Sequence, residues 1–272
     1  MVEHFLTFAP EGSLIEYSPR GIGVPARRGS RGEVAGFSVR SRSRLNKKLA
    51  MIKKHLLPCF VTLTYHEDYP LDFEGYKMDL HYFSNNLLSK FHGCSFIWKL
   101  EFQERGAPHY HLMVWGVSES DLRSYIPEMW HKIAGNGSEL HLAWHKGELG
   151  NGNENCVNQI RSWNGVKSYA SKYMSKMDDD TKRGGRIWGS RGSLPLSLIQ
   201  VFKVSLETAL LFRKKIMLER NYQFQRLGFW CSDFSADWFV FLWQLWELDY
   251  EVPPPEDRQD WDVGLYPEDF LQ

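Results

Sequence analysis

Hydrophobic positions along the first third of the chain follow first a helical and then a strand-like spacing. Leucine and isoleucine recur every three or four residues over 42–57, with the basic residues mostly on the other face. Residues 59–66, CFVTLTYH, follow a proline and are rich in β-branched and aromatic side chains, which is typical of a strand. An amphipathic pattern returns over 76–92. We therefore predict helix, strand and helix in this order.

A hairpin and two helices are predicted in the middle of the chain. Residues 94–103 and 109–117 read as strands around the turn-forming ERGAP segment. Residues 118–135 begin with good capping residues and end in a glycine, which predicts a helix. We expect a further strand at 139–145, ELHLAWH, and a helix over 164–177. This order indicates an α+β fold, with a central antiparallel sheet, flanking helices and a helical C-terminal extension.

The charge of the chain is balanced overall but strongly uneven. Its 272 residues carry no net charge, yet 20–54 hold eleven Lys and Arg against one acid. Residues 231–272 hold eleven Asp and Glu against one Arg. A basic front and an acidic tail indicate an anionic partner at one end, although two solvated arms of opposite sign would give the same pattern.

Three parts are expected from these features. They are a basic N-terminal arm and helix over 1–57, a core over 58–200 and an acidic, tryptophan-rich extension over 201–272. The four cysteines form no CxxC pair, which argues against a zinc ribbon or a disulfide framework. No signal-peptide pattern opens the chain, and the most apolar run, 238–246, is too short to span a bilayer. We expect a cytoplasmic protein, in a bacterial host cell, without a membrane partner.

The hairpin carries a candidate metal site. His109 and His111 are two residues apart, so both point to the same face of a strand. If the chain turns near Arg105, Glu101 lies directly opposite one of them. Two imidazoles and a carboxylate suit Mn²⁺ or Mg²⁺ with a phosphate, and would also hold Zn²⁺. Surface or core histidines remain the alternative, and Glu104 in the turn is a rival third ligand.

The segment YASKYMSK places phenols and ammonium groups on a stripe that helices normally fill with aliphatic residues. Tyr169, Lys172, Tyr173 and Lys176 occupy positions i, i+3, i+4 and i+7. The phenols stand at the border between an apolar sector and the lysines. They could pack over lysine stems as ordinary boundary residues. Beside a metal and ammonium groups, a phenolate could instead attack a phosphodiester and form a covalent phosphotyrosine.

Three motifs in this order resemble those of the HUH endonucleases. They are FVTLTY at 60–65, PHYH at 108–111 with Glu101 ahead of it, and YASKYMSK at 169–176. This superfamily contains rolling-circle replication initiators of phages, plasmids and small single-stranded DNA viruses, with related transposases and relaxases. The paired tyrosines are similar to the two-tyrosine branch, represented by phage gene A proteins and Helitron replicases. GRIWGSRGSLP at 185–195 also resembles a segment of many initiators, so the likeness covers roughly residues 40–200.

The resemblance implies a role for each matching residue. Glu101, His109 and His111 would hold a divalent ion, Mg²⁺ or Mn²⁺, in an RRM-like palm. The two tyrosines would be nucleophiles that alternate between cleaving and joining, with a 5′-phosphotyrosine linkage and a free 3′-OH. The lysines would position the phosphate or the metal water. Many relatives use one tyrosine only, so either Tyr169 or Tyr173 could be structural. Further residues implicated by position are Lys172, Lys176, Thr62 and Thr64.

Single-stranded DNA at a replication origin is the partner that these features indicate. Such DNA is held by bases stacked on aromatic rings and by phosphates on Lys and Arg. The sequence has no GxxxxGK[ST] motif, so we expect no nucleotide cofactor, with a host helicase and polymerase doing the unwinding and synthesis. The DNA-binding candidates, besides Thr62 and Thr64, are Arg40, Arg42, Arg44, Lys47, Lys48, Lys182, Arg183, Arg186, Trp188 and Arg191.

Three other functions remain open at this point. A transposase or mobilisation relaxase would use the same chemistry in a different biological setting. A zinc or iron enzyme of a barrel fold could use the two histidines and Glu101 on a small substrate. A single-strand DNA-binding module could have kept the fold without the activity.

Overall fold

The computed structural model describes residues 2–21, 37–66, 68–150, 152, 154–174, 186–220 and 229–231. The chain divides into two compact units. The larger unit takes its described residues from 37–49 and 54–195, and the smaller one from 2–21, 50–53 and 196 onward.

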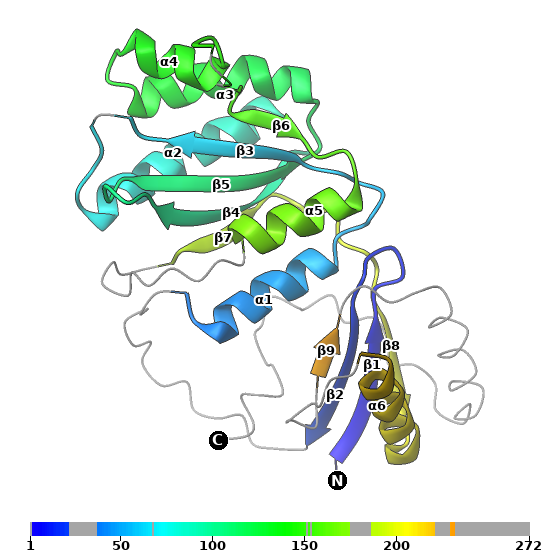
Figure 1. Ribbon diagram of the computed structural model, residues 1–272. Helices are drawn as coiled ribbons and strands as arrows, with labels where there is room; N and C mark the ends of the chain where they lie inside the picture. Colours follow the sequence, from blue (N-terminus) through cyan, green and yellow to red (C-terminus); the bar gives the residue numbers. More distant parts are fainter. Residues whose placement is uncertain are drawn as a thin grey trace. The chain divides into compact units, whose positions relative to one another are not determined.

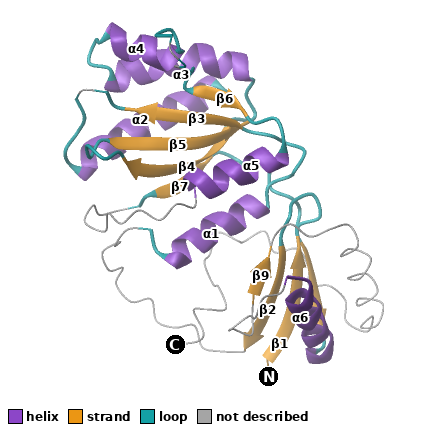
Figure 2. Ribbon diagram, in the orientation of Figure 1, coloured by secondary structure: helices purple, strands orange, loops and turns teal. Residues whose placement is uncertain are grey.

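The larger unit is built on a five-stranded, antiparallel sheet with the order β6-β3-β5-β4-β7 (Figure 1). Helices cover it, and Figure 2 shows α5 in front of the sheet and α2 behind it. This confirms the predicted α+β fold with a central antiparallel sheet. The elements are α1 (Val39–Ala50), β3 (Cys59–Thr64), α2 (Phe73–Lys90), β4 (Ser95–Phe102), β5 (Pro108–Trp115), α3 (Glu119–Ala134), α4 (Glu139–Lys146), β6 (Val157–Gln159), α5 (Trp163–Tyr169), the π-helix η1 (Ala170–Met174) and β7 (Trp188–Arg191).

Trp130 of α3 anchors the helices on one face of this sheet. Its fully buried ring packs edge-on against Tyr65, Phe83 of α2 and Tyr110 of β5. Its indole N–H donates to the carbonyl of Thr64 at 2.9 Å. The aromatic layer supplies a large apolar area, and the hydrogen bond satisfies the one polar atom of the ring. The opposite face of the sheet therefore remains for α1 and α5.

The predicted strand at 139–145 is wrong, because this segment forms the helix α4. Ser138 caps its first turn by accepting a hydrogen bond from the backbone N–H of His141. His141 and His145, four residues apart, are both buried on one side of the helix, while Leu140 is 59% exposed. The alternation of leucines suggested a strand, but the histidines supply the buried face, and helical spacing places them together.

Gly147 ends α4 in the left-handed conformation, at φ 75°, and a Cβ there would lie 2.5 Å from the backbone N of Asn155. We expect Gly147→Ala to lower the free energy of unfolding by at least about 2 kcal/mol, from backbone strain and steric contact together. Gly137 has φ 77° but open space around its Cβ position. Gly137→Ala is therefore the matched control, expected to cost about 1 kcal/mol. Urea denaturation measures both, and equal losses would contradict the contact with Asn155.

Two predicted helices differ from the observed ones at their ends. The helix expected at 164–177 is present, but it changes from α5 to the π-helix η1 after Tyr169, and residues 175–177 lie outside the described chain. The helix expected at 42–57 is α1, which ends at Ala50. Ile52 then forms a β-bridge with Leu196, and this pairing excludes a helical conformation there.

The smaller unit is a four-stranded sheet with the order β8-β1-β2-β9, and it joins both ends of the described chain. Its elements are β1 (Val2–Phe8), β2 (Ile15–Gly21), β8 (Gln200–Val204), α6 (Leu206–Arg220) and β9 (Phe229–Cys231). Phe212 and Ile216 of α6 pack with Phe8, Ile15 and other buried side chains of the sheet. The sequence analysis treats residues 1–57 and 201–272 as separate parts, and it did not predict β1 or β2.

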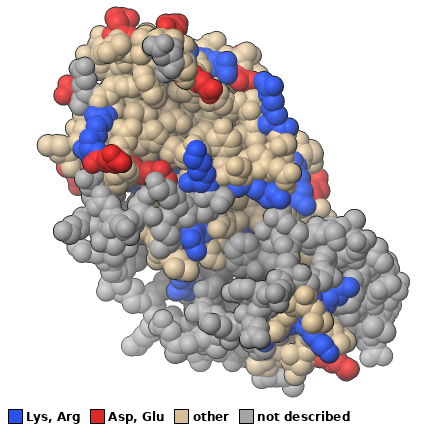
Figure 3. Space-filling model, viewed as in Figure 1, with Lys and Arg blue, Asp and Glu red and all other residues tan. Residues whose placement is uncertain are grey.

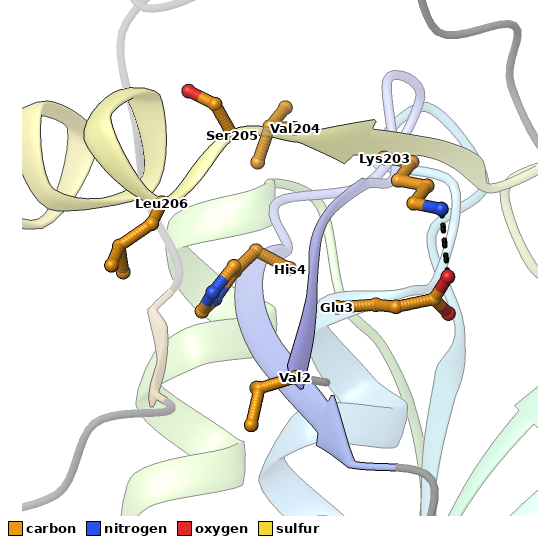
Figure 4. Close-up of a pocket in the computed structure, with 7 residues that line it drawn as sticks. All are labelled: Val2, Glu3, His4, Lys203, Val204, Ser205 and Leu206. Carbon is orange, nitrogen blue, oxygen red and sulfur yellow. Dashed lines mark hydrogen bonds and ion pairs between the residues drawn. The ribbon is translucent and has the colours of Figure 1, made fainter.

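A shallow pocket on this smaller unit is lined by the ends of β1 and β8 (Figure 4). Glu3 and Lys203 form an ion pair of 2.7 Å between the two strands there. Both side chains are about 40% exposed, so the pair contributes little to stability, on the order of 0–1 kcal/mol. Among the helices that the structure describes, none is long and apolar enough to cross a membrane.

Candidate active site on one face of the sheet

The hairpin of β4 and β5 places four polar side chains on one face of the larger sheet. Glu101 lies directly opposite His109, and Lys99 lies opposite His111. Residues two apart on a strand point the same way, so all four side chains share this face. This register confirms the prediction that Glu101 faces one of the two histidines across the hairpin.

Glu101 joins two of these side chains through its carboxylate oxygens. Lys99 Nζ donates to Oε1 at 3.1 Å, and His111 Nε2 donates to Oε2 at 3.2 Å. Lys99 is fully buried and Glu101 is 9% exposed. Burial opposes ionisation of Glu101, but the hydrogen bond with His111 and the charge of Lys99 outweigh it and lower its pKa to about 2. Glu101 is therefore an anion at neutral pH.

The low pKa of Glu101 predicts a loss of stability in acid. Its pKa is about 2 in the folded chain against an ordinary 4.5, so its contribution is complete above pH 4.5 and is lost as the pH falls through 2. The difference corresponds to about 3 kcal/mol. We expect the free energy of unfolding in urea to fall more steeply from about pH 5 to pH 2.5 for the natural chain than for Glu101→Gln. Equal slopes would refute this assignment.

His109 is neutral in the folded chain. Burial and the neighbouring His111 lower its pKa to about 3. Its Nδ1 is 3.1 Å from the hydroxyl of Thr64 on β3 and 3.4 Å from Nε2 of Gln103. Thr64 is buried, so its side chain orients His109 and offers little surface to a DNA strand. Thr62 is half-buried on the same face of β3.

The two tyrosines of the α5–η1 helix reach this same face, and Phe60 of β3 lies between them and the histidines. The Phe60 ring centroid is 4.5 Å from that of Tyr169, 5.1 Å from that of Tyr173 and 5.4 Å from that of His111. Tyr173 also contacts His111 directly, with ring centroids 4.6 Å apart. The two phenol rings stack at 5.7 Å. Hairpin and helix therefore meet within one aromatic cluster.

The π-helical turn sets the direction of the groups that follow Tyr169. Wider turns of this kind are rare and occur frequently at functional sites. Lys172 is exposed, and its Nζ lies 4.8 Å from the centroid of the Tyr173 ring. A hydrogen bond with Tyr173 raises the pKa of Lys172 above its ordinary value. An ammonium group thus stands beside the phenol nearest to His111. Lys176 lies outside the described residues.

The donor types on this face suit a divalent cation. One carboxylate and two imidazoles form a mixed oxygen and nitrogen set. With Nε2 of His111 donating to Glu101, its buried Nδ1 has no hydrogen-bond partner within the described chain. The donor atoms of Glu101, His109 and His111 do not all lie within 4.8 Å of one another, so cation binding requires these side chains to converge. Glu104 is exposed in the turn.

The predicted DNA-binding residues divide into exposed and internal ones. Arg44 and Arg186 are exposed, whereas Lys47 is 5% exposed and offers little surface to a ligand. Lys and Arg atoms gather near the middle of the view in Figure 3, where Figure 1 places α1 and α5. Arg40, Arg42, Trp188 and Arg191 are half-buried, Lys48 donates to Ser190, and Lys182 and Arg183 lie outside the described residues.

Two of these side chains connect elements of the larger unit. The indole N–H of Trp188 donates to the hydroxyl of Ser41 at 2.7 Å, which ties β7 to α1. Arg191 donates to the side chain of Asn85 on α2 at 2.7 Å. Both contacts have an evident structural role, and DNA binding by either residue remains a prediction.

A second histidine cluster lies at the end of β3 and was missed by the sequence analysis. His66, His141 and His145 each offer a nitrogen, and these atoms all lie within 4.8 Å of one another. Such a cluster could bind a divalent metal. The signal in the sequence was the pair His141 and His145 at spacing i, i+4, which is meaningful only on a helix. The strand prediction for this segment hid it.

The larger unit is thus an α+β domain with histidines, a carboxylate and two phenols on one face of its sheet. The family model of replication-associated protein ORF2 matches residues 58–178. This segment runs from β3 to beyond η1 and contains the hairpin and both tyrosines. Over these residues the chain is similar to replication-associated proteins, which indicates a role in DNA replication. No curated protein and no solved structure matches the chain.

Proposed function

We propose that this protein is an HUH endonuclease that initiates rolling-circle DNA replication. It would nick one strand of DNA at a specific site and later rejoin it, through a covalent link between a tyrosine and the 5′ phosphate. The observation that carries the proposal is the contact between Tyr173 and His111, at 4.6 Å between ring centroids. The match to a replication-associated family favours an initiator over a transposase or a relaxase.

The reaction exchanges one phosphodiester bond for another. The phenol oxygen of a tyrosine attacks the scissile phosphorus as its proton leaves, and the bond from phosphorus to the 3′ oxygen breaks. That oxygen takes up a proton and becomes a free 3′-OH, which can prime synthesis. Attack of a 3′-OH on the phosphotyrosine reverses these steps and reseals the strand. Such a covalent intermediate stores the bond energy needed for rejoining.

The chain supplies three kinds of group to this reaction. Lys172 stands beside Tyr173 and favours negative charge on the phenol and on the attacked phosphate. Phe60 and the stacked phenols position each other. Glu101, His109 and His111 would hold Mg²⁺ or Mn²⁺, which acts as a Lewis acid toward a phosphate oxygen.

Covalent capture of DNA tests this function. The protein is incubated with Mn²⁺ and a set of labelled single-stranded oligonucleotides that tile its own replicon. We expect an adduct that survives boiling in detergent, together with a released fragment that ends in a 3′-OH. Adduct formation should cease in EDTA. Oligonucleotide binding without cutting would instead identify a DNA-binding module, and the absence of both would favour a small-molecule enzyme.

A further inference from the structure

The histidine cluster at the end of β3 lies outside the chemistry proposed above. We propose that His66, His141 and His145 form a second metal site, which takes Zn²⁺ and fastens α4 to the end of β3. The site is separate in its residues from the set of Glu101, His109 and His111, and it does not depend on the proposed nicking activity.

Burial and spacing single out these three side chains. His141 is 2% exposed, His145 is fully buried and His66 is half-buried. Their ring centroids lie 4.8 Å (His66–His141), 5.2 Å (His66–His145) and 4.4 Å (His141–His145) apart. In the described part of the chain, this is the one set of three such donors whose atoms lie within 4.8 Å of one another.

Hydrogen bonds to the backbone determine which nitrogens are available. His145 Nδ1 donates to the carbonyl of His141 at 2.9 Å, so its lone pair is on Nε2. His141 Nε2 donates to the carbonyl of Thr64 at 3.3 Å, so its lone pair is on Nδ1. Metal-bound histidines almost always donate their other N–H to a carbonyl or carboxylate in this way. The second shell of a metal site is therefore already present.

One nitrogen of the cluster has an unmet requirement. Nδ1 of His141 is buried and has no hydrogen-bond partner among the residues that the structure describes. A buried polar atom without a partner is costly unless an ion or a water occupies the space beside it. His145 Nε2 accepts a hydrogen bond of 3.3 Å from the backbone N–H of Thr64. This long contact is the one that a bound ion would replace.

The donor set favours zinc over the hard cations. Three neutral imidazoles suit Zn²⁺, whereas Mg²⁺ and Mn²⁺ prefer oxygen ligands. Tetrahedral Zn²⁺ with bonds of about 2.0–2.1 Å needs nitrogens about 3.4 Å apart, so the rings must close further than they stand. His66 follows the last residue of β3 and is not held in a strand, which allows that movement. A fourth position is left for water.

The position of the cluster indicates a structural purpose. Helix α4 has eight residues, too few to be stable without tertiary contacts. Zinc would join it to the segment that follows β3. Thr64, whose backbone contacts both His141 and His145, also orients His109 through its hydroxyl. The metal would therefore stabilise the strand end beside the candidate active site without contacting substrate.

Metal analysis of the full chain tests this proposal. The protein is purified without chelators or an affinity tag that contains histidine, and its metal content is measured by mass spectrometry. We expect about one zinc ion per chain. Replacement by Co²⁺ should give the visible absorption of a tetrahedral site. A chain that retains no zinc, and whose melting temperature does not rise when Zn²⁺ is added, would overturn the proposal.

Matched variants assign the metal to this cluster. His66→Ala should abolish zinc retention and should keep the helix content by circular dichroism, because its side chain lies outside the regular elements. His141→Asn provides a second loss at a buried position. His92→Ala removes an exposed histidine, and the double variant His109→Ala, His111→Ala removes the other candidate ligands; both should retain zinc. Zinc lost in the double variant but kept in His66→Ala would place the metal at the hairpin and overturn the proposal.

Discussion

Replacing both Tyr169 and Tyr173 with phenylalanine should abolish the covalent DNA adduct, a loss of at least about 10³-fold. Phenylalanine keeps the ring that packs against Phe60, so the fold should be retained while the nucleophilic oxygen is lost. Adducts are counted on denaturing gels with a labelled oligonucleotide. Tyr82→Phe changes an exposed tyrosine on α2 and serves as the control. An undiminished adduct in the double variant would exclude both phenols as the nucleophile.

The single variants should differ from each other. The ring of Tyr173 lies directly against His111 and beside the ammonium of Lys172, whereas Tyr169 contacts Phe60 and the other phenol. We therefore expect Tyr173→Phe to reduce the first cleavage most. Tyr169→Phe should still cleave and should fail in transferring the strand to a second phenol. The reverse order of effects would show that the helix rearranges when DNA binds.

Removal of an imidazole from the hairpin should have the second largest effect. We expect His111→Ala to lower the rate of adduct formation in Mn²⁺ by at least about 100-fold, because a cation ligand and the partner of Glu101 are lost together. The rate is measured over a range of Mn²⁺ concentrations. A weakened site should be partly rescued by more Mn²⁺, whereas a purely structural defect should not respond.

A control variant separates this effect from general damage to the protein. His81 is exposed on α2 and hydrogen bonds only locally, to Asn85. His81→Ala should leave the rate and its Mn²⁺ dependence unchanged. An His111→Ala protein with the natural rate would show that the hairpin does not take part in the reaction.

The candidate site was largely predictable because its parts are local in sequence. Two histidines one residue apart must share a strand face, and a five-residue turn leaves Glu101 few partners across the hairpin. The helix that carries the tyrosines follows from spacing alone. What the sequence left open was whether hairpin and helix meet, since more than fifty residues separate them. Phe60, from a third segment, is the side chain that joins them.

Other features depended on long-range packing. Residues 139–145 alternate as a strand would, and only the burial of His141 and His145 against the end of β3 selects a helix. The π-helical turn after Tyr169, which brings Tyr173 to His111, has no local signal that distinguishes it from an α-helix.

The sequence by itself determined the strands and helices of the larger unit, the register of its hairpin and the residues that carry chemistry. Local spacing is enough for these, because each depends on neighbours along the chain. Tertiary structure alone decided that the first and last strands share a sheet, that α4 is a helix and that three distant histidines form a cluster. Each of these depends on which surfaces are buried together, and burial is a property of the folded chain as a whole.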